Sequence, residues 1–467
     1  MSLLKAAVGI MVLLIASLIA VVWRSDHTIL LLSSILTLFV SLWFMQATVR
    51  VFDLRRPTIA GVWFFCYLLM CWLPSLLIFM EITPEGYSYP IYAGPHLPRF
   101  LFATTAILLA VPLGAWLANW ALQFKPVAVA SYFEHPVLET TQISRAYIVL
   151  LSAALALTLL YFYEVKELPI VAMVKDPGNF AYLAMLREES FVGLDSHFVY
   201  AYSVLREALY PFLIALALVK YIATKQKKWL VLFFTSLSAG VMFASVSIAR
   251  GPVATILLVV AACWFLCRLE KVTTKQVAIA LALIIAFPLY VSLASSSVDA
   301  TVADALRIVF VRLCYSPAYV AYVYFEVIPK EVQFQYGAAT GKLALLLGRE
   351  HFDAARYVLF TIYPDALETG SAGGAFFADF YANFGLPGVV VGGVLLGAVM
   401  QSIQILLTRR RKTAASMAAY AFMFYAFYMT ISRSLPTVLL STGVIFVLGF
   451  WWFLAKSDER LNASLDS

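Results

Sequence analysis

Twelve apolar stretches, each about long enough to cross a bilayer, divide this chain of 467 residues. Most hold about 17 to 22 residues, and a helix of that length covers an apolar layer roughly 30 Å thick. Because backbone N–H and C=O groups in lipid must pair within their own segment, each stretch is expected to be a helix, and the predicted fold class is all-α. The predicted spans are Lys5–Trp23, Thr28–Ala47, Ile59–Met80, Arg99–Leu122, Tyr147–Tyr163, Ser203–Tyr221, Trp229–Ser247, Pro252–Cys267, Gln276–Leu293, Leu386–Leu407, Ala414–Ile431 and Leu435–Leu454.

The loops between these stretches alternate in their content of Lys and Arg. One alternate set of short loops carries sixteen of these cations, and the opposite set carries four. The positive-inside bias therefore predicts that the first set, and with it both termini, faces the cytoplasm of a multi-pass protein. The net charge of +7 follows from this topology and gives no reason to expect a nucleic-acid partner. A soluble core could not absorb a chain that is 63% hydrophobic and 13% charged.

The whole chain, residues 1–467, is predicted to be a single transmembrane domain with two large loops on the side opposite the cytoplasm. These loops cover residues 164–202 and 294–385, and loops of such length are usually functional. The second contains an apolar run, Ile308–Ile328, that is interrupted by Arg312 and Pro317. We favour a helix that lies at the membrane surface or against the bundle; a thirteenth crossing remains the alternative, and it would need a compensating span.

Metal binding has no recognisable pattern in the sequence. Four of the five cysteines lie within spans, and Cys314 is the only one in an outer loop. Cys263 and Cys267 share a helix face, but no histidine is nearby, so packing is the preferred interpretation. The five histidines are scattered, and no metal site made of protein ligands and no cofactor is predicted.

Ionisable residues avoid the middle of the predicted spans. Ion-coupled carriers generally place such residues at mid-membrane, so this pattern argues against a proton or sodium relay. The ionisable side chains gather instead at the outer ends of spans and in the two large loops. Any chemistry is therefore expected at the extracytoplasmic surface of the membrane.

Two arginines lie at turns that are predicted to face outward. Arg250 is followed by Pro252, and Arg433 is followed by Pro436. In both turns the proline suits the first turn of a helix, whose free N–H groups and positive dipole end would face the same side as the arginine. An arginine beside such a helix start is equipped to bind an anion, although either side chain could instead reach lipid headgroups.

Four further arginines in or beside the large loops are weaker candidates for binding an anionic substrate. Each could equally be solvated or paired with a neighbouring carboxylate. Tyrosines are dense between them and would suit stacking on sugar rings, but they would suit the membrane interface as well. The four residues are Arg187, Arg206, Arg307 and Arg312.

The segment Gly370–Gly388 has the sequence GSAGGAFFADFYANFGLPG, and a span with glycines at 392, 393 and 397 follows it. This segment resembles the pattern that closes the large periplasmic loop of Wzy-type O-antigen polymerases. The arrangement of spans and loops also resembles that family, with an outer-turn arginine at Arg250 and a late arginine at Arg433. One departure is Asp379, because the family pattern commonly has Glu at this position.

The resemblance implies a membrane glycosyltransferase, an oligosaccharide repeat unit polymerase at the periplasmic face of the bacterial inner membrane. Its donor and acceptor would both be polyprenyl-diphosphate-linked oligosaccharides, and a chain-length regulator and a flippase are possible partners. Arginines would stabilise the negative charge that develops on the departing diphosphate. We assign this role to Arg250 and Arg433.

A base is also needed to accept the proton of the acceptor hydroxyl. Asp379 and His351 are ranked first because they lie in the large loop near the family motif. The other candidates are Glu189, Glu350, Asp353 and Asp365.

Other functions remain open at the level of the sequence. An O-antigen ligase resembles the polymerases in layout. Enzymes that use a polyprenyl-monophosphate sugar usually carry an acidic pair in the first outer loop, where this chain has only Asp26. A lipid-linked oligosaccharide flippase would be expected to show two similar halves, and no such repeat is visible. No glycine pattern for a nucleotide sugar is present, so the donor is expected to arrive on a lipid.

Overall fold

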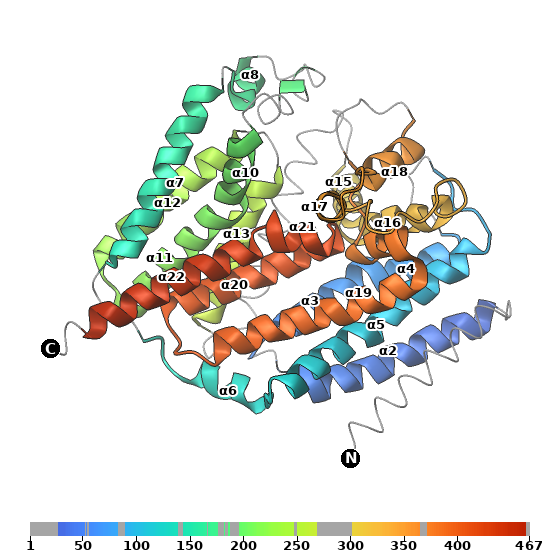
Figure 1. The fold of residues 1–467 in the computed structure, drawn as a ribbon, viewed down its shortest axis with the longest axis horizontal. Coiled ribbons are helices and arrows are strands. Elements are labelled where there is room, and N and C mark those ends of the chain that lie inside the picture. Colours follow the sequence, from blue (N-terminus) through green and yellow to red (C-terminus); the bar gives the residue numbers. More distant parts are fainter. Residues whose placement is uncertain are drawn as a thin grey trace. The chain divides into compact units, whose positions relative to one another are not determined.

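The structure is a computed structural model that describes residues 27–51, 53, 56–82, 89–138, 143–165, 167–175, 182, 185–186, 196–246, 250–268, 301–364 and 371–463. Within these residues the regular structure is entirely helical (Figure 1). Ten helices among them are long and apolar enough to cross a membrane. The all-α prediction is confirmed for this part of the chain, and the protein is a multi-pass membrane protein.

Nine of the predicted spans correspond to nine of these ten helices. The predicted span Pro252–Cys267 corresponds to a shorter apolar helix, Gly251–Leu266. The predicted spans Lys5–Trp23 and Gln276–Leu293 lie outside the described residues. The tenth helix is Leu306–Val327, which comes from the apolar run of the second large loop.

The chain divides into two compact units. Unit 1 comprises Met1–Ala130, Lys275–Leu406 and Phe427–Pro436. Unit 2 comprises Ser131–Thr274, Leu407–Ala426 and Thr437–Ser467. The helices of unit 1 are α2 (His27–Val49), α3 (Ile59–Tyr67), η1 (Leu68–Trp72), α4 (Leu73–Phe79), α5 (His96–Ala121), α15 (Val302–Phe310), η4 (Val311–Tyr315), α16 (Ser316–Val327), α17 (Gly341–Leu346), α18 (Ala354–Ile362), α19 (Phe376–Thr408) and η5 (Met429–Ile431).

Glycines allow α5 and α19 to pack backbone against backbone. A Cβ on Gly114 of α5 would overlap the carbonyl oxygen of Val394, and a Cβ on Gly397 of α19 would overlap that of Val111. Small residues permit such close approach between helices in an apolar medium, where dispersion contacts must hold the helices together. Gly393, which lies against Ala110, and Gly397 therefore form the contact of α19 with α5.

Polar side chains join α2 and α19 to α5 in the same unit. The hydroxyl groups of Ser34 and Thr105 lie 2.7 Å apart. Asn119 of α5 donates to the carbonyl of Thr48 at 3.1 Å and accepts from Gln401 of α19 at 2.7 Å. Because lipid offers no competing hydrogen bonds, such links fix the position of each helix along its neighbour.

The apolar run of the second large loop forms one continuous helix made of α15, η4 and α16. Tyr315, Tyr319 and Tyr322 lie along one side of it, and their hydroxyl groups donate to the carbonyls of Ile82, Tyr89 and Tyr92 in the connection between α4 and α5. The helix also packs on α4 and α5. Its length and composition would also suffice for a crossing, so the choice between a helix against the bundle and a thirteenth crossing stays a prediction.

A break at Gly385 divides α19 into two parts. Gly385 has φ 66° and ψ −158°, a conformation that side chains with a Cβ rarely adopt. Pro387 follows in the first turn of the second part, where its missing N–H leaves no helical bond unmade. The predicted beginning of the span at Leu386 therefore coincides with the break, and the first part of α19 precedes the predicted span.

The helices of unit 2 bury charged groups. Helix α10, the π-helical turn η2 and α11 are continuous, so Arg206 and Glu207 lie about three turns inside a helix that begins at Ser196. The helix therefore begins before the predicted span Ser203–Tyr221, and the two charged residues lie well inside it. The bounds are α7 (Arg145–Glu164), α8 (Pro169–Lys175), α10 (Ser196–Val204), η2 (Leu205–Leu209), α11 (Tyr210–Thr224), α12 (Lys227–Ser245), α13 (Arg250–Leu266) and α22 (Val444–Ala463). The chain changes unit within α6 (Val127–Glu134), α20 (Ala414–Tyr428) and α21 (Leu435–Leu440), and also near the end of α19, after Leu406.

Candidate functional site

Three hydrogen-bonded side chains of unit 1, Thr340, Asp379 and Asn383, form what we name the Asp379 cluster. Asp379 and Asn383 lie in the first part of α19, and Thr340 lies in the segment before α17. The hydroxyl of Thr340 lies 3.0 and 2.8 Å from the two carboxylate oxygens of Asp379 and donates to them. The side-chain oxygen of Asn383 accepts from the backbone N–H groups of Gly337 and Ala339, at 2.7 and 3.1 Å. Its amide group donates to the carbonyl of Asp379 at 2.9 Å. The acidic residue and the asparagine of the family motif are therefore both fixed to residues 337–340.

His351 lies next to this cluster. Its side chain is exposed. A Cβ placed on Gly341, the residue after Thr340, would lie 3.3 Å from Nε2 of His351. The two residues that the sequence ranks first as a base, Asp379 and His351, thus lie against the adjacent residues Thr340 and Gly341.

The turn that carries Arg433 also belongs to unit 1. A Cβ placed on Gly373 would lie 2.5 Å from the carbonyl oxygen of Ser432, the residue before Arg433. A Cβ on Gly374 would lie 2.9 Å from the ring of Tyr324 in α16. The glycine run of the family motif therefore packs on the turn of the late arginine, and Arg433 itself is partly buried. Three of the four predicted catalytic residues come from segments that contact one another within this unit.

The remaining predicted residues are placed differently. Arg250 is the first residue of α13 in unit 2, and its side chain lies outside the described part of the chain. Arg307 and Arg312 are exposed on α15 and η4. Asp353 accepts from the backbone N–H of Arg356 at 2.9 Å and caps α18, and Glu350 is exposed. Arg187, Glu189 and Asp365 lie outside the described residues.

Arg206 forms an ion pair in unit 2 instead of facing a cavity. Its guanidinium lies 3.4 Å from the carboxylate of Glu207, which also accepts from the hydroxyl of Tyr425 at 3.0 Å. Glu207 is 5% exposed. A buried charge is tolerated when it is paired in this way, so the geometry favours the interpretation of Arg206 as the partner of a neighbouring carboxylate.

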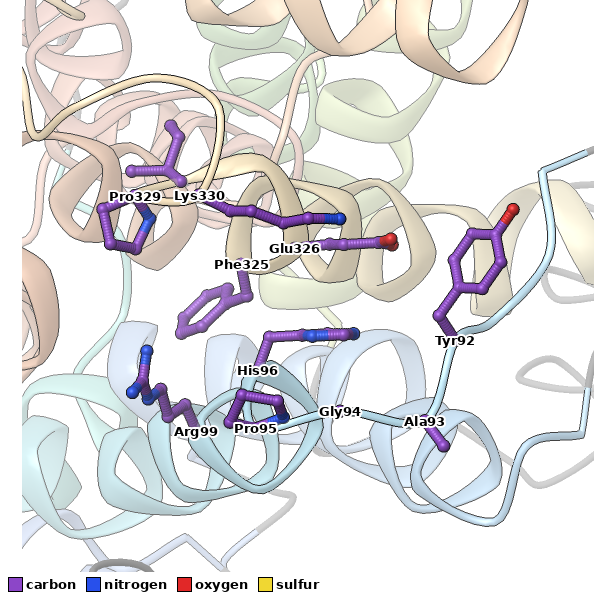
Figure 2. Close-up of a pocket in the computed structure, with 11 residues that line it drawn as sticks. Tyr92, Ala93, Gly94, Pro95, His96, Arg99, Phe325, Glu326, Pro329 and Lys330 are labelled. Carbon is purple, nitrogen blue, oxygen red and sulfur yellow. The ribbon is translucent and has the colours of Figure 1, made fainter.

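A cavity of about 470 Å³ lies between the start of α5 and the end of α16, both in unit 1. We name it the α5 pocket. Figure 2 shows the side chains of Glu326 and Lys330 on one wall and those of His96 and Arg99 on the other. Tyr92 and Phe325 add aromatic surface. Two basic side chains and one acidic side chain therefore line a hollow whose volume lies in the range of small-molecule sites.

Glu326 is the buried acid of the α5 pocket. Its side chain is 4% exposed, and its Oε2 atom has no hydrogen-bond partner among the described residues. The hydroxyl groups of Tyr89 and Tyr322 approach the carboxyl group. Burial, followed by the nearby charge of Glu326, raises the pKa of Tyr89, so this residue keeps its proton and acts as a donor to the carboxylate.

Tyr381 connects the α5 pocket to the helix of the Asp379 cluster. Its ring stacks on Phe325 with centroids 3.7 Å apart, and its hydroxyl donates to the carbonyl of Ile328 at 3.2 Å. The side chain of Arg99 also interacts with this hydroxyl. Asp379 and Asn383 therefore bond to residues 337–340, whereas Tyr381, from the same helix, contacts Phe325 and Ile328, which line the α5 pocket.

The sequence did not identify the α5 pocket as a site. Arg99 was recognised only as one of four outer cations, and Glu326 lies inside an apolar run. The two walls are far apart in the sequence: the hydroxyl of Tyr322, which accepts from the backbone N–H of Tyr92, belongs to a residue 230 positions later in the chain. The polar residues in HLPR at the start of α5 and in EVIPK after α16 were a local signal, but only the fold shows that they meet.

No group of three or more His, Cys, Asp and Glu side chains is placed to hold a metal ion in the part of the chain that the structure describes. Comparison of the chain with family models, with curated proteins and with solved structures gives no match. The resemblance to Wzy-type polymerases therefore stays a prediction from the sequence.

Proposed function

We propose that this protein is a membrane glycosyltransferase that joins polyprenyl-diphosphate-linked oligosaccharide repeat units into a surface polysaccharide. In this proposal it works at the periplasmic face of the bacterial inner membrane. The observation that supports it most is the packing of Gly373 on Ser432. Two features of the resemblance that are far apart in the sequence, the glycine run and the turn of Arg433, are neighbours in unit 1.

The proposed chemistry is a transfer of the growing glycan from its carrier to a new repeat unit. The bond between the anomeric carbon and the diphosphate oxygen breaks, and its electron pair stays on the diphosphate. Arg433 stabilises that charge, and its planar guanidinium stays protonated throughout. A hydroxyl oxygen of the acceptor sugar forms the new bond, and its proton passes to Asp379 or His351. The hydroxyl of Thr340 holds the Asp379 carboxylate in one orientation.

A strain that lacks the gene tests the proposal through the banding pattern of its surface glycan. We expect glycans of one repeat unit in the deletion strain and a full ladder after complementation with the wild-type gene. The Arg433→Ala variant should not restore the ladder. Arg409→Ala is the control, because Arg409 lies in the loop between α19 and α20, which is predicted to be cytoplasmic. A full ladder in the deletion strain would refute the proposal.

The same strain separates the alternatives. Loss of a ligase would leave long glycans on the polyprenyl carrier and none on the lipid A core. Loss of a flippase would leave single repeat units on the inner leaflet of the membrane. The proposed polymerase predicts single repeat units on the outer leaflet, and extraction of lipid-linked glycans after treatment of intact spheroplasts with a glycosidase distinguishes the two leaflets.

A further inference from the structure

The α5 pocket is lined by a buried hydrogen-bond acceptor, a carboxylate oxygen of Glu326, that lacks a donor among the described residues. Oε2 of Glu326 is enclosed by protein and makes no hydrogen bond within the described residues. An enclosed oxygen without a donor destabilises the fold, so native proteins usually satisfy such atoms. Because Glu326 lines the cavity, a ligand with a hydroxyl group can supply the missing donor there.

The same cavity presents cations to a second part of such a ligand. Arg99 comes from the first turn of α5, and Lys330 follows α16. Both side chains are exposed. Helix α5 begins after Pro95 without a side-chain cap, so its positive dipole end adds to these two charges. Lys330 also lies close enough to Glu326 to interact with its charge. Arginine and lysine near a helix start are suited to the oxygens of a phosphate group.

The walls between these groups suit a sugar ring. Tyr92 is 48% exposed and contributes an accessible aromatic face, while Phe325 is buried behind the cavity wall and stacks on Tyr381. Sugar rings combine apolar faces with hydroxyl groups at their edges, so they bind to aromatic faces and to a carboxylate at the same time. The cavity of about 470 Å³ has room for one ring with its phosphate.

We propose that the α5 pocket binds a glycosyl phosphate, with a sugar hydroxyl donating to Glu326 and the phosphate oxygens accepting from Arg99 and Lys330. Of this assignment, only the identity of the lipid carrier, a polyprenyl diphosphate, rests on the proposed function. The headgroup of phosphatidylglycerol offers the same combination of hydroxyl and phosphate, and the experiment must therefore distinguish the two sources.

The test measures binding to the full-length protein in detergent by thermophoresis. The probes are a short-chain prenyl diphosphate that carries one glucose, the same prenyl diphosphate without the sugar, and phosphatidylglycerol. We expect the glucose-bearing probe to bind about tenfold more tightly than the other two. Arg99→Ala and Lys330→Ala should each weaken both diphosphate probes by about tenfold or more, because each removes a charged hydrogen bond.

Glu326→Gln separates the two halves of the ligand. The glutamine has the shape of the glutamate but lacks its charge, so affinity for the glucose-bearing probe should fall about tenfold, while the sugar-free probe should bind equally well or more tightly. Arg145→Ala and Lys228→Ala are the matched controls, because both residues are exposed near helix starts in unit 2. Elution of each variant as a single species in gel filtration checks that it is folded.

Equal affinity for glucose-bearing and sugar-free probes, or tighter binding of phosphatidylglycerol, would overturn the assignment. Its failure is separable from that of the proposed function. If the deletion strain makes a normal ladder while the variants still lose the probe, the polymerase proposal fails and the pocket assignment stands. If the deletion strain loses its ladder while the variants bind like the wild type, the pocket assignment fails and the polymerase proposal stands.

Discussion

Asp379 and Glu326 are acids of unit 1 with different surroundings. Asp379 accepts from Thr340 with both of its oxygens, so the protein itself fixes its position. Glu326 is more deeply buried and has one oxygen that no described residue satisfies. A carboxylate that the fold orients is suited to proton transfer, and a carboxylate with an oxygen that lacks a hydrogen-bond donor is suited to ligand binding.

Asn383 is the residue whose loss should affect the stability of unit 1 most clearly. In Asn383→Ala the buried N–H groups of Gly337 and Ala339 lose their acceptor. We expect a loss of about 2–4 kcal/mol in the free energy of unfolding, since each stranded donor costs about 1–3 kcal/mol. The unfolding temperature in detergent measures it. Gln333→Ala, an exposed control in the preceding segment, should change this free energy by less than about 0.5 kcal/mol. Equal shifts in the two variants would contradict the role given to Asn383.

The helices show what the sequence can and cannot predict. Apolar length alone located nine of the spans, because lipid forces such segments to be helical. The predicted beginning of the span at Leu386 coincides with the break in α19, where glycine permits the φ of 66° at Gly385. The sixth span begins earlier than the predicted Ser203, because Arg206 and Glu207 interrupt the apolar pattern there, whereas the fold accommodates them as an ion pair inside the helix. Local sequence patterns do not predict contacts between distant segments, such as those around the α5 pocket.

The contact between α5 and α19 depends on the absence of a side chain at Gly397. Gly397→Ala should destabilise the protein by about 1–3 kcal/mol, because the added methyl group overlaps the carbonyl oxygen of Val111 and forces the helices apart. Gly449→Ala in α22 is the control, since a Cβ there meets no atom within 4 Å. That substitution should be neutral or stabilising by up to about 1 kcal/mol, because alanine favours helix more than glycine does. Thermal unfolding in detergent measures both, and equal effects would argue against the close packing.

The tyrosine contacts of α16 predict that both ends of its helix face the same side of the membrane. In a Cys314→Ser background, Thr301→Cys and Lys330→Cys place single accessible thiols before α15 and after α16; both native side chains are exposed. We expect an impermeant maleimide to label both cysteines from outside in intact spheroplasts. Phe427→Cys, at a buried position, is the unlabelled control. Labelling of only one of the two positions would mean that the helix crosses the membrane.

At the level of the complete protein, the described residues of unit 1 bring together most of the groups that the proposed chemistry needs. The Asp379 cluster, His351 and the turn of Arg433 belong to this unit, and so does the α5 pocket. Unit 2 contributes Arg250 at the start of α13 and the buried pair of Arg206 and Glu207. The sequence grouped Arg250 with Arg433 by their similar turns, and the structure adds that the two belong to different units.

Reconstitution of the purified full-length protein in liposomes tests whether the chain itself forms glycosidic bonds between lipid-linked units. The only substrate supplied would be a synthetic polyprenyl-diphosphate-linked repeat unit. We expect the wild-type protein to produce a ladder of glycans and to release one polyprenyl diphosphate for each bond formed, and we expect Arg433→Ala to produce neither. If the wild-type protein releases no polyprenyl diphosphate and forms no ladder, or if Arg433→Ala is as active as the wild type, the proposed function is wrong.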